Sequence, residues 1–153
     1  MLKTFAICLL GLVLVQGTVA AQTPREQDQI LRTFQQRVEH IAATAVDPQV
    51  FTLPVATVFR QVIARTLDAQ PHVAHLTGVG TALPLAHHPA VFEPFPATEL
   101  HEFPALLARA LPPLPPTLEY RLIGNDLVLR QVGDDVIVAV LRDAVGGVAL
   151  TRR

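Results

Sequence analysis

The stretch that decides the fold is PPLPPTLEYRLIGNDLVLRQVGDDVIVAVL, residues 112 to 141. Apolar and polar residues alternate along 118–123 and 127–132, and 136–141 is rich in β-branched residues. This period is typical of strands, and the Gly-Asn-Asp and Gly-Asp-Asp triplets between the runs are typical of tight turns. The pattern predicts a three-stranded antiparallel β-meander over 117–142. Its third strand, apolar on both faces, is either the most buried one or lies between helices and Pro-rich chain.

Upstream of this stretch, residues 22–70 predict two amphipathic helices. The first begins at Thr23, where Glu26 completes a capping box. The second begins at Thr52, with Pro54 in its first turn. We expect the two helices to pack as an antiparallel helical hairpin against the sheet, which makes the fold class α+β. Their apolar stripes comprise Ile30, Leu31, Phe34, Val38, Ile41 and Ala45 in the first helix, and Val55, Val58, Phe59, Val62, Ile63 and Leu67 in the second.

Residues 71–116 form a Pro/His-rich connector, since ten of the 13 prolines lie there. Each proline removes a backbone donor and favours extended geometry in the residue before it. The connector should therefore hold no long regular element, apart from one short helix that begins at Pro104. The last segment, 143–153, has no pattern and is expected to be a flexible tail.

The N-terminal residues 1–21 have the features of a secretory signal peptide. Lys3 precedes a short apolar region over 5–15, and the small residues up to Ala21 fit a cleavage site. The predicted location is periplasmic or secreted, with no stable membrane anchor after cleavage; an uncleaved N-terminal anchor is the alternative. The single cysteine, Cys8, lies inside the leader, so the mature chain must fold without disulfides.

The composition of the mature chain excludes several kinds of chemistry. It lacks Ser, Cys and Lys, so it can form no Ser or Cys nucleophile, no Schiff base and no thiolate metal site. The net charge is −1 and the arginines are scattered. A protein of this kind has no electrostatic footprint for nucleic acid.

The histidines of the connector are the main hint of a site. Imidazole suits Zn, Ni, Co or Cu ions, and Glu99 and Glu102 flank one of the imidazoles. The alternative is that these are solvated loop residues, because a Pro-rich loop offers no obvious neighbouring groups to orient the imidazoles. The candidate metal ligands are His72, His75, His87, His88 and His101.

Other polar residues have structural interpretations. Asp134 and Asp135 are typical turn residues, so a two-carboxylate hydrolase is disfavoured. Arg121 and Arg130 lie on adjacent predicted strands, where an ion pair with Glu119 is favoured over an anion site. The PPLPP run is interpreted as a rigid connector that leads into a strand, rather than as a ligand for an aromatic groove.

Two segments carry a resemblance to known proteins. Through VFTLPVATVFRQVIA (50–64) and residues 111–141, the mature chain resembles a group of uncharacterised exported bacterial proteins. Those proteins carry acids or amides on the strands at the positions of Gln131, Asp135 and Ala139. The meander is also similar to the small sheet domain of periplasmic nickel and cobalt homeostasis proteins, which implies a periplasmic sheet fold.

The sequence therefore leads to one hypothesis and one alternative. The hypothesis is a small exported, non-enzymatic protein-interaction module that binds another protein of the bacterial envelope. It requires no cofactor, and it predicts an exposed apolar patch on the sheet or the helices. The alternative is a periplasmic metal-binding or metal-homeostasis factor, which requires at least three histidines to meet.

Overall fold

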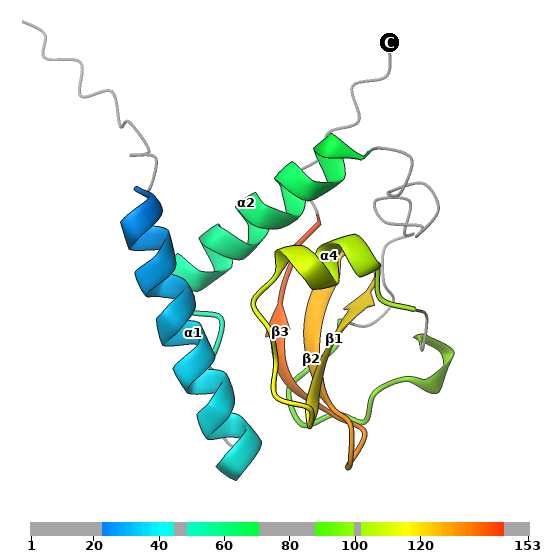
Figure 1. Cartoon of the computed structure of the whole chain (residues 1–153). Coiled ribbons are helices and arrows are strands. Elements are labelled where there is room, and N and C mark those ends of the chain that lie inside the picture. Colours follow the sequence, from blue (N-terminus) through cyan, green and yellow to red (C-terminus); the bar gives the residue numbers. More distant parts are fainter. Residues whose placement is uncertain (1–22, 45–48, 71–87, 100–101, 146–153) are drawn as a thin grey trace, which may run out of the picture.

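The protein is described by a computed structural model, which covers residues 23–44, 49–70, 88–99 and 102–145. Helices come first and a three-stranded antiparallel sheet follows, which confirms the α+β class with its C-terminal meander (Figure 1). None of the described helices combines the length and apolarity of a membrane span. The elements are α1 (Pro24–Thr44), α2 (Leu53–Ala69), the 3-10 helix η1 (Ala97–Glu99), α4 (Ala105–Ala110), β1 (Leu118–Ile123), β2 (Asp126–Gln131) and β3 (Val136–Leu141).

Helix α1 begins with the predicted capping box. The backbone N–H of Thr23 donates to Glu26 Oε2 at 2.8 Å, and the backbone N–H of Glu26 lies 3.4 Å from Thr23 Oγ1. The first of these bonds, from the backbone of Thr23, lowers the pKa of the Glu26 carboxyl. Two of the N–H groups at the helix start are thereby satisfied locally, so the sequence itself sets where α1 begins.

The two long helices meet in an aromatic cluster. The ring centroid of Phe59 in α2 lies 4.7 Å from that of Phe34 in α1, and Phe51, in the link between the helices, lies 5.4 Å from Phe59. Arg37 Nη1 donates to the backbone oxygen of Gln49 at 2.8 Å, which ties the link to α1. The pair is the predicted two-helix unit, and its helices diverge from their contact instead of running side by side (Figure 1).

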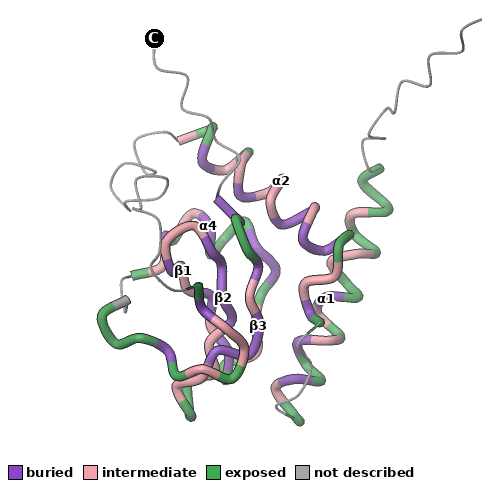
Figure 2. The backbone as a smooth tube through the Cα atoms, turned by 180° about the vertical axis from the view of Figure 1, so that it is seen from behind, coloured by how far each residue is buried: buried purple, intermediate pink, exposed green. Residues whose placement is uncertain are grey.

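The sheet has the order β1-β2-β3, and its two faces pack against different parts of the chain. One face joins α1, α2 and α4 in the main core, so the buried positions of helices and strands face one another (Figure 2). The opposite face holds a smaller cluster around Phe95. The third strand contributes to both clusters, which confirms that it lies between helices and Pro-rich chain. The smaller cluster comprises Phe95, Ile123, Val128 and Ile137, with Val140 against it.

Strand β3 is itself covered along part of its outer edge. The backbone N–H of Phe92 donates to the oxygen of Ile137 at 2.8 Å, and the N–H of Ile137 donates to the oxygen of Glu93 at 2.9 Å. One residue pair further on, the N–H of Phe95 donates to the oxygen of Asp135 at 2.8 Å. A short piece of the connector, Phe92–Phe95, therefore lies along β3 like a fourth strand.

Helix α4 and the proline run after it are fixed to the sheet through Tyr120. The Tyr120 hydroxyl donates to the backbone oxygen of Pro112 at 2.9 Å, and its ring stacks on Phe103 with centroids 5.9 Å apart. The proline run is thus anchored and leads directly into β1, as a rigid connector should.

Burial of Tyr120 predicts a loss of stability in alkali. It raises the pKa of the hydroxyl well above its usual value of about 10, which is retained in the unfolded chain. Above pH 10 the unfolded state releases a proton that the folded state keeps, so the free energy of unfolding should fall by about 1.4 kcal/mol per pH unit. Tyr120 is the only tyrosine and Lys3 is the only lysine, so few other groups titrate there.

Urea titrations of the protein between pH 8 and pH 11 would measure this slope. In Tyr120→Phe the free energy of unfolding should be lower at pH 8 by about 1 kcal/mol, because one buried hydrogen bond is lost. It should then change little with pH. An equal alkaline slope in both proteins would contradict the assignment to Tyr120.

Candidate functional site

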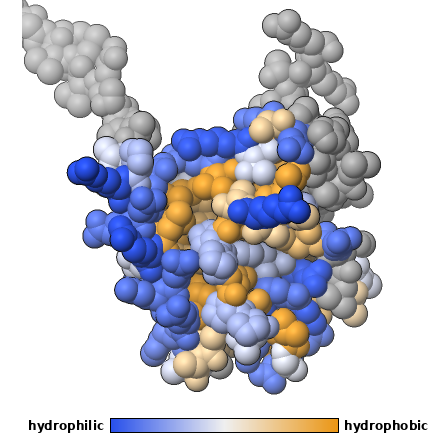
Figure 3. Space-filling model, viewed as in Figure 1, coloured by the Kyte–Doolittle hydropathy of each residue, from blue (hydrophilic) through white to orange (hydrophobic). Residues whose placement is uncertain are grey.

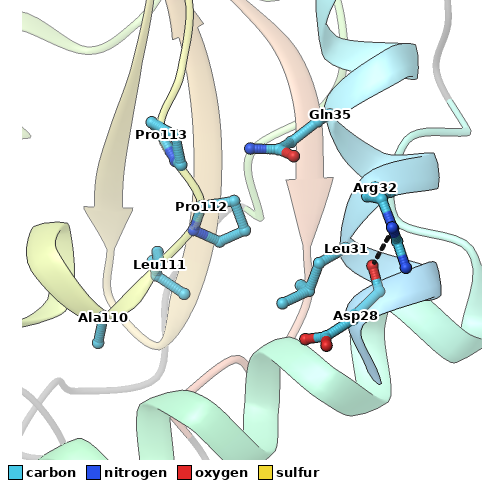
Figure 4. Close-up of a pocket in the computed structure, with 8 residues that line it drawn as sticks. All are labelled: Asp28, Leu31, Arg32, Gln35, Ala110, Leu111, Pro112 and Pro113. Atoms are coloured by element: carbon cyan, nitrogen blue, oxygen red, sulfur yellow. Dashed lines mark hydrogen bonds between the residues drawn. The ribbon is translucent and has the colours of Figure 1, made fainter. Parts of the chain in front are cut away.

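A groove runs between α1 and the chain that follows α4. It has a volume of about 430 Å³ and is lined by Asp28, Leu31, Arg32 and Gln35 on one side and by Ala110, Leu111, Pro112 and Pro113 on the other (Figure 4). In the space-filling view, apolar surface lies in the hollow between polar α1 and the body of the molecule (Figure 3). The groove is thus an open, partly apolar surface feature.

The α1 wall overlaps the stripe that enters the core, because Leu31 also packs against the core. Its four residues recur at steps of three and four, so they share one side of α1. Leu31 and Gln35 point across the groove towards the opposite wall, and Arg32 Nε donates back to the oxygen of Asp28 at 3.3 Å (Figure 4). This wall offers one apolar side chain between polar ones.

The opposite wall is apolar and rigid. Helix α4 ends at Leu111, whose backbone is extended, and Pro112 is held through its oxygen by Tyr120. Leu111 and Pro112 are buried, whereas Ala110 and Pro113 at the rim are exposed. Two successive prolines restrict the backbone here, so the wall keeps its shape without a bound partner.

A buried carboxylate forms the centre of a second polar cluster. The Asp126 side chain is 2% exposed, and its Oδ2 lies 3.0 Å from Arg142 Nη1 and 3.2 Å from His88 Nδ1. Its Oδ1 accepts the backbone N–H of Asp143 at 2.8 Å. Asp126 therefore joins the start of β2, the turn after β3 and the connector.

Of the five predicted metal ligands, the structure describes one. Four of the five histidines, His72, His75, His87 and His101, lie outside the described residues. His88 is described, but its carboxylate partner already binds the arginine, whose positive charge opposes a cation at that oxygen. Within the described part of the chain, no three His, Cys, Asp or Glu side chains could hold a metal ion.

The predicted ion pair on the sheet is confirmed. Glu119 is bidentate with Arg121, at 2.8 and 2.9 Å, and also pairs with Arg130 directly across the strands. The hydrogen bond from Arg121 lowers the pKa of the Glu119 carboxyl. Arg130 also binds Asp135 and lies over the Phe95 ring, 5.4 Å from its centroid. This network holds the connector to the outer face.

The three positions singled out by the resemblance do not form one site. Asp135 pairs with Arg130 on the outer face, whereas Ala139 is fully buried in the core on the helix side. Gln131 ends β2, and its backbone oxygen accepts the N–H of Asp135 at 3.0 Å. The three residues lie near one another in the chain because Asp135 belongs to the turn that joins the strands of Gln131 and Ala139.

Comparisons with known proteins add no family to this description. No model of a protein family matches the chain, and neither the curated proteins nor the solved structures include a significant match.

The groove was not predicted from the sequence. The available signal was weak: Leu31 belongs to the apolar stripe of α1, but a groove also requires the wall from 110–113.

Proposed function

We propose that the chain is a small exported, non-enzymatic interaction module that binds another envelope protein through the groove. The observation that carries this proposal is the pairing of one apolar, proline-stiffened wall with one mixed wall on α1. Such a surface suits a segment of a partner protein that is apolar on one side and polar on the other. Export itself is inferred from the leader-like residues 1–21.

The chemistry of the described residues supports binding over catalysis. The buried and half-buried carboxylates Asp126, Glu119 and Asp135 each pair with an arginine. A carboxylate held by an arginine already has hydrogen-bonding capacity occupied, so it is less available to act on a substrate. The lack of Ser, Cys and Lys in the mature sequence supports the same conclusion.

Charge placed at the rim of the groove should weaken partner binding. A photo-crosslinking residue at position 110, in cells that export the chain, should attach a partner, which is then purified and titrated. Ala110→Glu should weaken that binding at least about tenfold, because a carboxylate would be buried against apolar surface. Ala110 is exposed at the end of α4, so the substitution should not disturb the core.

Ala108→Glu is the matched control, since it places the same charge on an exposed residue of α4 that does not line the groove. Its affinity should stay within about twofold of the wild type. Equal losses in both variants, or crosslinks from position 108 alone, would remove the groove from the proposal.

A further inference from the structure

The Phe92–Phe95 segment occupies the outer edge of β3 in the way that an added strand would. Two backbone hydrogen bonds join it to Ile137 of β3, a third joins it to Asp135 just before the strand, and Pro94 is opposite Val136. Proline has no N–H, so position 94 adds no donor to the ladder. Backbone bonds of this kind are what an extended peptide forms when it joins a sheet edge.

One side chain anchors the segment. The Phe95 ring is buried against Ile123, Val128 and Ile137, with the Arg130 guanidinium over its face. Further towards the N-terminus, His88 contacts Asp126 at the other end of the sheet. The aromatic ring fills the apolar pocket on the outer face, and the sheet edge supplies the rest of the recognition.

The segment is held in a strained conformation. Phe92 has φ of 70°, in the left-handed region that a bulky side chain rarely adopts, and its ring is 58% exposed. It lies in a tight turn in which the N–H of Glu93 donates to the oxygen of Ala90 at 3.3 Å. Glycine or asparagine would be the usual residue at such a position.

We propose that the edge of β3, together with its apolar pocket, is a strand-accepting surface, and that Phe92–Phe95 is its built-in occupant. A partner would supply an extended peptide with an aromatic side chain at the position of Phe95. The strained turn at Phe92 weakens the built-in segment, so an incoming peptide can displace it. This surface lies apart from the groove and does not depend on it.

The built-in segment and a free peptide would compete for the β3 edge, and this competition determines the apparent affinity of the free peptide. A tethered segment acts at an effective concentration of about millimolar, so a free peptide of equal intrinsic affinity competes poorly with it. Weakening the anchor of the tethered segment should therefore reveal binding of a free one. Relieving the strain should have the opposite effect.

The first experiment uses a labelled synthetic peptide with the sequence of residues 88–99, titrated by fluorescence anisotropy with the mature chain. Phe95→Ala in the protein should bind the peptide at least about tenfold more tightly than the wild type, because the tethered competitor has lost its anchor. A peptide carrying the same Phe95→Ala change should not bind. No peptide binding by a cooperatively folded Phe95→Ala protein would overturn the proposal.

A second experiment on the intact segment covers the case in which Phe95→Ala fails to fold. Hydrogen exchange in the wild type should show the Ile137 amide, which bonds to Glu93, exchanging faster than the amides of β2. Phe92→Gly should slow the Ile137 exchange about threefold, because relief of the left-handed conformation outweighs the added chain flexibility. The proposal would also be overturned if the Ile137 amide exchanged only through global unfolding, or if it exchanged faster in Phe92→Gly than in the wild type.

Discussion

Replacing Phe59 with alanine is expected to lower the free energy of unfolding by about 3–5 kcal/mol. The Phe59 side chain is 0% exposed and contacts all three parts of the main core. Its ring lies 4.7 Å from Phe34 in α1, 5.4 Å from Phe51 in the link, and 6.2 Å from Tyr120 in β1. A cavity at this place cannot be filled by movement of one element alone, so the loss should be near the upper end.

Urea unfolding followed by circular dichroism would measure the change. Leu53→Ala is the matched control, because Leu53 belongs to the same helix but is 79% exposed; its effect should stay within about 0.5 kcal/mol. A loss below about 2 kcal/mol in Phe59→Ala would contradict the packing of α2 between α1 and the sheet.

Replacing Asp126 with alanine is expected to cost about 2–3 kcal/mol, because the backbone N–H of Asp143 and the Arg142 guanidinium both lose a charged acceptor. The cost is limited by Arg142, which is half exposed and can be solvated by water. His88→Ala should cost less than about 1 kcal/mol, since its side chain is 61% exposed.

The same urea titrations, at pH 7, would compare the two variants. Asp126→Asn is the informative intermediate, because it keeps the shape of the side chain and removes the charge. It should lie between the wild type and Asp126→Ala. Equal losses in Asp126→Ala and His88→Ala would show that the carboxylate is not the centre of the cluster.

Features fixed by short-range interactions were the ones that the sequence predicted well. The capping box at Thr23 and the turns around the meander depend on residues a few positions apart, and both are present. The ion pair of Glu119 and Arg130 followed from strand alternation once the turn between them was identified.

Features that depend on distant segments were missed. The groove requires α1 to lie beside residues 110–113, about eighty positions later, and no local pattern encodes that distance. Asp126 was interpreted only as a turn residue, although it is a buried acceptor for Arg142 and Asp143. The prolines favoured loop over strand, yet Phe92 and Phe95, on either side of Pro94, donate backbone hydrogen bonds to the β3 edge.

Pro94 has one more consequence, for the behaviour of the protein at high concentration. A sheet whose last strand has free donors can recruit identical chains and grow into fibrils. With the Phe92–Phe95 segment in place, the outermost chain beside β3 carries a residue that has no N–H to offer. The segment therefore also opposes growth of the sheet beyond β3 for as long as it stays docked.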